Sequence, residues 1–318
     1  MLKLRYKVTV FILFFLHAFT SMAKPDTVKI GAYVMSVHDI NFHDNEYTMR
    51  MWLWFLHNNP KFNFDTQTEV PNAKTIEQPD LQNYDYPNGL KWQIMKMKCV
   101  MKQPWDVGDY PFDKQKLLVK FENTVYDKNA LVFKADTIGS QCHPDLTVEG
   151  WSLEHFKVFT GTTKYKTAFG DPEIKEQHSE YSNFNIEMIL HRDAWGLFLK
   201  LFVGMYIAFM ISCISFLISL DNAEPRFGLP VGGLFAAVGN KYIIDSLLPE
   251  SSEMTLVDSL HSITFLFIFL IISFSAITLI LYNRNKINLA KKVNKLSFIG
   301  LVACFGLINV IMIVHACL

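Results

Sequence analysis

Residues 105–115 read WDVGDYPFDKQ, from Trp105 to Gln115. Proline fixes its own φ and holds the residue before it in an extended conformation, so the sequence predicts a turn at residues 110–113 that presents two aromatic rings and a carboxylate. The turn consists of Tyr110, Pro111, Phe112 and Asp113. It lies between two alternating runs, one ending near Lys102 and one beginning at Lys116, and this arrangement predicts a β-hairpin.

This loop resembles the signature loop of the Cys-loop receptor superfamily, the pentameric ligand-gated ion channels. That signature has an apolar residue, another one two positions on, and then aromatic-Pro-x-Asp. The residues that fit it are Trp105, Val107, Tyr110, Pro111 and Asp113. Gln103 and Leu117 replace the two cysteines that bracket the loop in animal receptors, which points to the prokaryotic type without the disulfide. An ordinary proline hairpin would account for the loop but not for the apolar segments that follow.

The chain is divided into a charged half and an apolar half. Its 318 residues are long enough for about two domains, and most uninterrupted apolar runs follow Arg192. We expect a multi-domain protein in which an extracytoplasmic β-sandwich of immunoglobulin-like type, at 24–192, precedes a four-helix transmembrane bundle at 193–318. The expected helices lie at about 196–220, 226–248, 255–282 and 296–318.

The N-terminus predicts export of the β-rich half. Residues 1–23 have the pattern of a secretory signal peptide, with basic residues, a short apolar core and a small-residue cleavage site at Ala23. A retained membrane anchor is the alternative. The basic loop Asn283 to Lys295 fits the positive-inside rule. The expected location is therefore the plasma (bacterial inner) membrane, with the β-rich half on the periplasmic side.

Composition and motifs narrow the class of function. The 30 basic and 30 acidic residues cancel, and no extended basic face indicates nucleic acid as a partner. No zinc spacing, nucleophile–base spacing or phosphate loop is present, so we expect no enzyme activity, metal or cofactor. Cys99 and Cys142 both lie in the exported half, where a disulfide between them is an open possibility.

The resemblance places the ligand between neighbouring subunits, in a box of aromatic side chains. The candidates are Tyr126, Tyr165, Phe169 and Tyr181 from one subunit, and Trp52, Trp54 and Trp92 from its neighbour. Ring faces attract a cationic amine by about 0.5–2 kcal/mol each. Packing is the alternative role, and it is the favoured one for Trp52 and Trp54.

Two observations leave the identity of the ligand undecided between an amine and protons. Thr124 occupies a position where many amine-binding relatives have a tryptophan. In addition, titratable side chains gather near the first predicted hairpin, so protons are an alternative ligand, although a solvated polar turn also explains the cluster. The cluster consists of Asp39, His43, Asp44 and Glu46.

The segment from Glu224 to Leu229 resembles the cytoplasmic entrance of the family's pore-lining helix. Steps of three and four residues along that helix define one stripe. The candidate pore-lining residues are Glu224, Arg226, Gly228, Gly232, Phe235, Gly239 and Tyr242. A ring of Phe235 side chains would close the pore by dewetting, and a ring of Glu224 carboxylates would favour inorganic cations. Glycines replace the usual inner Ser/Thr rings, so a non-conducting membrane sensor of the same fold is the alternative.

Coupling between the halves requires contacts at their junction that differ between two states. By resemblance, the junction contains Asn41, Asp44, Tyr110, Pro111, Phe112, Asp113, Arg192 and Pro249. Asp113 beside Arg192 would form a partly desolvated ion pair, whereas an exposed pair would contribute little. The expected assembly is a homopentamer in a lipid bilayer, opened by a small-molecule or proton ligand.

Overall fold

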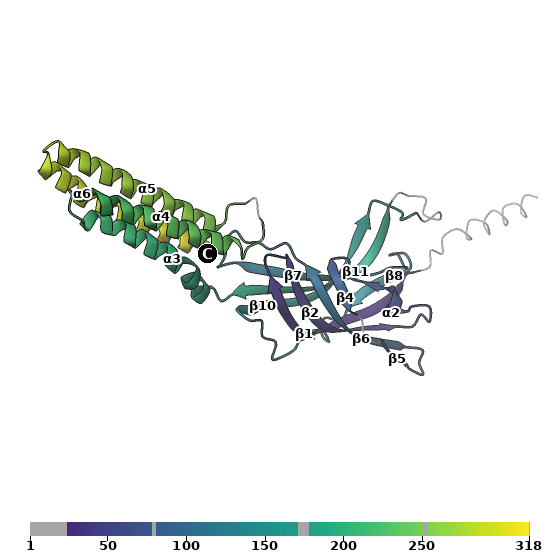
Figure 1. The fold of residues 1–318 in the computed structure, drawn as a ribbon. Helices are drawn as coiled ribbons and strands as arrows, with labels where there is room; N and C mark the ends of the chain where they lie inside the picture. The colour runs from purple at the N-terminus through teal and green to yellow at the C-terminus, as the bar shows by residue number, and fades with distance from the viewer. Residues whose placement is uncertain (1–23, 78–80, 171–177, 251–252, 318) are drawn as a thin grey trace, which may run out of the picture.

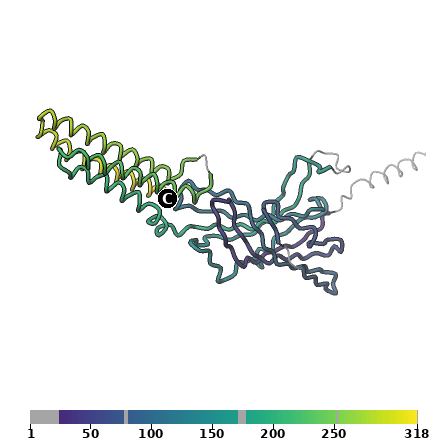
Figure 2. Tube along the Cα trace, viewed as in Figure 1, coloured from purple at the N-terminus to yellow at the C-terminus, as the bar shows by residue number. Residues whose placement is uncertain are grey.

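The structure is a computed structural model, and it describes residues 24–77, 81–170, 178–250 and 253–317. The predicted signal peptide, residues 1–23, lies outside the described residues. A large β-sheet-rich N-terminal region is followed by four long apolar helices, which lie side by side in an elongated bundle at one end of the sheets (Figures 1 and 2).

The strands of the described residues form two sheets. They are β1 (Asp26–Asn41), β2 (Glu46–His57), β3 (Thr68–Glu69), β4 (Ala73–Glu77), β5 (Gln82–Asp85), β6 (Lys91–Lys102), β7 (Lys114–Asn123), β8 (Leu131–Ala135), β9 (Gln141–Cys142), β10 (Trp151–Tyr165) and β11 (Ser179–Arg192). A seven-stranded sheet has the order β4-β6-β2-β1-β8, with β5 beside β6 and β9 beside β1. A four-stranded sheet has the order β10-β11-β7-β3. The short helix α2 (Phe64–Gln67) precedes β3.

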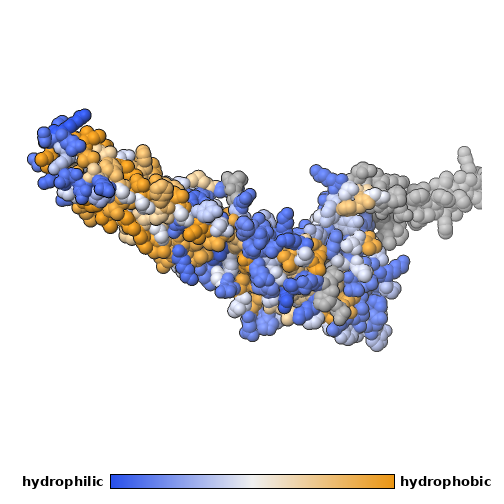
Figure 3. All heavy atoms as spheres, in the orientation of Figure 1, coloured by the Kyte–Doolittle hydropathy of each residue, from blue (hydrophilic) through white to orange (hydrophobic). Residues whose placement is uncertain are grey.

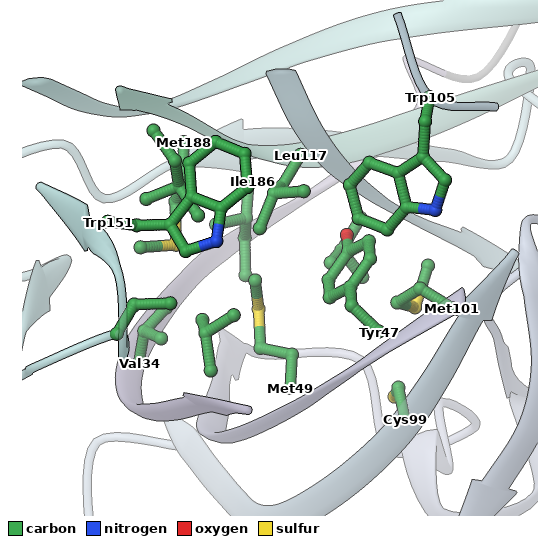
Figure 4. Close-up of a cluster of buried hydrophobic side chains, with 14 of the residues drawn as sticks. Val34, Tyr47, Met49, Cys99, Met101, Trp105, Leu117, Trp151, Ile186 and Met188 are labelled. Atoms are coloured by element: carbon green, nitrogen blue, oxygen red, sulfur yellow. The ribbon is translucent and has the colours of Figure 1, made fainter. Parts of the chain in front are cut away.

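Alternating side chains build a core that both sheets share. In β2, Met49, Met51 and Leu53 are fully buried, while the residues between them face the other side of the sheet. Figure 4 shows residues of this core from both sheets, with two tryptophans among them. Those tryptophans are Trp105, which follows β6, and Trp151, which starts β10.

The predicted hairpin around Pro111 is wrong. β6 ends at Lys102 in the seven-stranded sheet, whereas β7 begins at Lys114 in the four-stranded sheet. Residues 103–113, the crossing loop, therefore lead from one sheet to the other. Alternation of apolar and polar residues identifies each strand, but it fits any partner strand equally well, so it does not reveal this crossover.

Cys99 and Cys142 are both free. Cys99 lies in β6 and Cys142 in β9, and β2 and β1 lie between these strands in the sheet. Burial raises the pKa of the Cys99 thiol to about 12, so this side chain serves as an inert apolar filler.

The helical part contains α3 (Ala194–Ile214), the 3₁₀ helix η1 (Ser215–Leu217), α4 (Ala223–Asp245), α5 (Leu256–Asn283) and α6 (Ile287–Ala316). Four of these helices, counted among the described residues, are long and apolar enough to cross a bilayer. Figure 3 shows their apolar surface beside the largely hydrophilic surface of the β-rich region. The chain is therefore compatible with a multi-pass membrane protein.

The last helix begins earlier than the sequence predicts. α6 starts at Ile287 rather than near Leu296, so its first turns are formed by part of the predicted basic loop. Lys291, Lys292 and Lys295 are exposed there. Lysine favours helices, and hydropathy reports only the apolar part of a helix, so the prediction missed this basic extension.

Helices α3 and α4 approach closely at Gly233. A Cβ atom on this residue would collide with the Ser212 hydroxyl and lie 2.7 Å from the backbone oxygen of Ala208. Gly232, the neighbouring residue, has nothing within 4 Å of the same position. The two glycines therefore have different roles, because only Gly233 is required by the packing.

We expect Gly233→Ala to destabilise the bundle. Overpacking costs about 1–3 kcal/mol, which exceeds the gain of about 0.5–1 kcal/mol from replacing a helical glycine by alanine. Thermal unfolding of the purified protein in detergent measures the effect. Gly232→Ala is the matched control and should leave the midpoint unchanged or raise it. Equal midpoints for both variants would contradict the close α3–α4 contact.

Candidate functional site

Asp113 and Arg192 form a buried ion pair where the sheets meet the helices. Arg192 is the last residue of β11, and its Nε and Nη2 donate to Asp113 Oδ1 and Oδ2 at 2.7 and 3.1 Å. Their side chains are only 10% and 2% exposed. Gln115 Nε2 also donates to Asp113 Oδ2, at 2.6 Å. The predicted contact is present, and its bidentate geometry is that of a strong pair.

Aromatic rings enclose the guanidinium of Arg192. Its Cζ lies 4.0 Å from the ring centroid of Trp151, 4.6 Å from that of Phe42 and 4.9 Å from that of Tyr110. Burial raises the pKa of the Tyr110 hydroxyl, although the nearby arginine opposes the shift. The arginine is thus held by a carboxylate and by cation–π contacts from three different segments.

The turn between β1 and β2 also joins this site. The Trp105 indole N–H donates to the backbone oxygen of Asn41 at 2.9 Å. Within the turn, Asn41 Nδ2 donates to Asp44 Oδ2 at 2.7 Å. The first turn is therefore fixed to the start of the loop that carries Tyr110 and Asp113.

The crossing loop contacts two of the long helices. The backbone N–H of Leu256, at the start of α5, donates to the oxygen of Gly108 at 2.8 Å. The ring of Phe112 lies 5.2 Å from that of Trp195 and 5.4 Å from that of Phe198, both in α3. One loop thus touches the sheet core, the Arg192 site, α3 and α5.

Pro249 lies in the link between α4 and α5. Together with His43 of the first turn it lines a cavity of about 350 Å³. Lys241 of α4 also lines this cavity and donates to Asp258 of α5 at 2.7 Å. The predicted coupling residues therefore gather at one junction, and their part in gating stays a prediction.

The titratable residues near the first turn have individual partners. His38 Nδ1 lies 2.8 Å from Asp39 Oδ2, and Lys74 Nζ donates to Glu46 Oε2 at 2.5 Å. Among the described residues, no group of three or more His, Cys, Asp or Glu side chains could hold a metal ion. These contacts are those of a solvated polar turn, the alternative explanation of the cluster.

Three predicted ligand-binding residues form an aromatic cluster at the β10–β11 end. The ring centroid of Tyr165 lies 5.2 Å from that of Phe169 and 5.9 Å from that of Tyr181. Phe169 is 62% exposed, so the cluster is open to solvent. Tyr126 packs elsewhere, with its ring 4.8 Å from that of Phe62.

Glu122 is hydrogen-bonded to Tyr165 of this cluster and was not predicted as a site residue. Its side chain is 1% exposed and accepts hydrogen bonds from the hydroxyls of Thr163 and Tyr165, the latter at 2.7 Å. Glu69 is its cross-strand partner on β3. Burial and the charge of Glu122 raise the pKa of Glu69.

The two glutamates lie directly opposite each other on neighbouring strands. Neither Glu69 nor Glu122 forms an ion pair within the described residues, although like charges directly opposite on neighbouring strands repel. Other buried carboxylates of the fold are neutralised, as Glu187 is by Lys116 at 2.6 Å and Lys157 at 2.7 Å. Two acidic side chains therefore lie beside the aromatic cluster without a basic partner among the described residues.

The three candidate tryptophans belong to the seven-stranded sheet, away from the Tyr165 cluster. Trp52 and Trp54 lie on the face of β2 opposite the core. Trp54 packs against Gly31, and Lys96 Nζ lies 5.8 Å from the Trp52 ring. Trp92 stacks on Tyr84 at 4.9 Å. A single chain does not bring them to the cluster.

One face of α4 is exposed along its whole length. It carries Glu224, Gly228, Gly232, Phe235, Gly239 and Tyr242, which we call the α4 stripe. Phe235 is 73% exposed and Tyr242 77%. Arg226 is the exception among the candidates, because it is fully buried inside the bundle. Two residues turn a helix by roughly 200°, so Arg226 and Glu224 face opposite sides.

No protein-family model matches this chain.

Proposed function

We propose that the chain is one subunit of a homopentameric ligand-gated ion channel of the Cys-loop receptor superfamily, in its prokaryotic form without the loop disulfide. The β-rich region would be an extracytoplasmic immunoglobulin-like sandwich, and the four long helices would form the pore domain in the plasma membrane. Ligand binding between subunits would move the junction and open a pore for inorganic cations.

The observation that carries this proposal is the junction itself. Residues 110–113 contact Arg192 at the end of β11 and also contact α3, while Gly108 bonds to α5. A binding domain that only anchored the protein would need no buried ion pair and aromatic enclosure at this place. The arrangement supports the proposal that a conformational change in the β-rich region is transmitted to the helices.

The exposed α4 stripe supports the pore. The exposed face that combines Phe235, Tyr242 and three glycines suits a partner surface or a lumen better than the remaining, aliphatic part of the bundle surface does. In a pentamer, five copies of the stripe would surround one axis, with Phe235 as the constriction and Glu224 at the inner mouth. Arg226 would stay behind the pore wall, because it is buried within its own subunit.

For the ligand we propose a small cationic amine. The carboxylate of Glu122 would supply the counter-charge, and the cluster of Tyr165, Phe169 and Tyr181 would supply the ring faces. Trp52, Trp54 and Trp92, on the outer face of the other sheet, would complete the box from the adjacent subunit.

The test is current across planar bilayers that contain the purified pentamer. We expect small primary amines to evoke a cation-selective current, and Glu224→Ala to lower the cation-over-anion permeability ratio about tenfold, equivalent to about 1.4 kcal/mol. Glu149→Ala, an exposed glutamate of the β-rich region, is the matched control. Silence from an intact pentamer under amines and pH steps would contradict the channel and favour a non-conducting sensor of the same fold.

A further inference from the structure

A run of basic side chains lies at the start of α6, at the end of the bundle far from the sheets. Residues 284–295 contain no aspartate or glutamate, and their basic side chains are all exposed: Arg284, Lys286, Lys291, Lys292 and Lys295. Figure 3 shows hydrophilic side chains at this end of the bundle, directly beside the apolar surface of the helices. The segment is therefore strongly cationic where the apolar part of α6 begins.

This positive charge is not balanced within the part of the chain that the structure describes. There, no carboxylate forms an ion pair with a basic side chain of residues 284–295. At the opposite end of the bundle, by contrast, Lys241 is paired with Asp245 and Asp258, each at 2.7 Å. Like charges three or four residues apart on a helix repel each other, and the three lysines of α6 have this spacing. The start of α6 therefore calls for negative charge from outside the chain.

The packing of α6 sets the direction of this charge. Ala290 is fully buried. Asn294 points inward, since its Oδ1 accepts from Arg226 Nη2 at 2.7 Å and its Nδ2 donates to the backbone oxygen of Phe216 at 2.8 Å. Residues three, four and seven positions apart share one face of a helix. One exposed face, which we call the α6 outward face, therefore carries Lys292, Lys295, Leu296 and Ile299.

The α6 outward face combines cations and aliphatic side chains in the order that a lipid presents its own groups. Leu296 is 68% exposed and Ile299 53%, and both follow the lysines toward the apolar part of a helix that is long enough to cross a bilayer. Lysines at the end of such a helix reach the lipid headgroups while their carbon chains stay on apolar surface. The positive-inside rule requires basic residues here but no particular helix face, so it does not account for this arrangement.

We propose that the α6 outward face binds an anionic phospholipid, such as phosphatidylglycerol, in preference to a zwitterionic one. Lys292 and Lys295 would hold the phosphodiester, whose charge no headgroup amine balances, and the two aliphatic side chains would contact an acyl chain. A nucleic acid or an acidic protein segment would leave Leu296 and Ile299 in water. The bound lipid would brace the turn of α6 from which Asn294 holds Arg226.

The test measures thermal unfolding of the full chain in a neutral detergent while phosphatidylglycerol, or phosphatidylcholine with the same acyl chains, is added. We expect phosphatidylglycerol to raise the midpoint in a saturable way and phosphatidylcholine to raise it less. The double variant Lys292→Gln with Lys295→Gln should increase the half-maximal mole fraction of phosphatidylglycerol about 30-fold, equivalent to about 2 kcal/mol. Added salt should weaken the difference between the two lipids, because it screens exposed charges.

Two control variants separate the effect of charge from other effects. Lys292→Arg with Lys295→Arg keeps both charges and should bind phosphatidylglycerol at least as tightly as the unchanged chain. Lys200→Gln removes an exposed lysine of α3, at the opposite end of the bundle, and should leave the titration unchanged.

Three results would overturn the proposal. The first is an equal midpoint with the two lipids, and the second is a glutamine double variant that titrates like the unchanged chain. The third is an equal rise with glycerol phosphate or polyglutamate, because these water-soluble anions carry the charge without an acyl chain. Conductance is not a readout here, so the outcome is independent of the channel hypothesis.

Discussion

Asp113→Asn should lower the free energy of unfolding by about 3–5 kcal/mol, the largest effect we expect from any single substitution. The variant keeps the size of the side chain but leaves Arg192 buried among aromatic rings without its counter-charge. Thermal and denaturant unfolding of the purified protein would measure the loss. Because Arg192 leads directly into α3, we also expect the proposed channel to lose its agonist-evoked current before the proposed pentamer dissociates.

Lys114→Ala is the control for this substitution. It removes an ion pair with Glu154 at the next position, where the side chains are 56% and 49% exposed and the atoms lie 3.2 Å apart. Exposed pairs contribute about 0–1 kcal/mol, so its effect should be small. If both variants were equally stable, the Asp113–Arg192 pair would have no more weight than a surface contact.

Glu122→Gln should weaken the binding of a cationic amine about 30-fold or more. Truncating one partner of a buried charge pair costs about 2–5 kcal/mol, and the amide keeps the shape and, through its one oxygen, one of the two hydrogen bonds that Glu122 accepts from Thr163 and Tyr165. The concentration dependence of the evoked current and calorimetric titration with the same amine would both report the shift.

Glu180→Gln provides the matched control. Glu180 lies on β11, the strand beside β7, and Lys128 and Lys164 hold it at 3.1 and 2.6 Å, so its charge is already neutralised. Those hydrogen bonds also keep its pKa below the usual range. If Glu122→Gln left the amine affinity unchanged, the carboxylate of Glu122 would not take part in ligand binding. A response to pH steps alone would then favour protons as the ligand.

The sequence predicted a β-rich half followed by long helices, because strands and helices leave different patterns of apolar residues. Alternation with a period of two marked strands such as β2, and long uncharged runs marked the helices. It could not assign β6 and β7 to different sheets, since register and partner choice depend on contacts far along the chain. It also placed the start of α6 too late, because charged helical turns outside a membrane have no hydropathy signal.

Some site residues could likewise be predicted from the sequence, and others could not. Asp113 and Arg192 could be paired in advance because the loop resembles a known signature. Glu122 was missed because it lies on the face of β7 that carries Lys116 and Lys120, where an acidic residue resembles ordinary surface. Arg226 was placed in the pore by its position at the start of a helix. The helical rotation between it and Glu224 would have argued against that assignment.

The crossing loop has one end fixed in each sheet, so any rotation of one sheet against the other must strain it. Its backbone is tied to α5 through Gly108, and Asp113 ties it to Arg192 at the end of β11, just before α3. In the proposed channel, a rotation of the sheets would therefore reach α3 and α5 first. The α4 helix would follow through its close contact with α3 at Gly233 and through Lys241, which bonds to Asp258 of α5. The pore lining would then behave as a driven element that moves with the two helices packed against it.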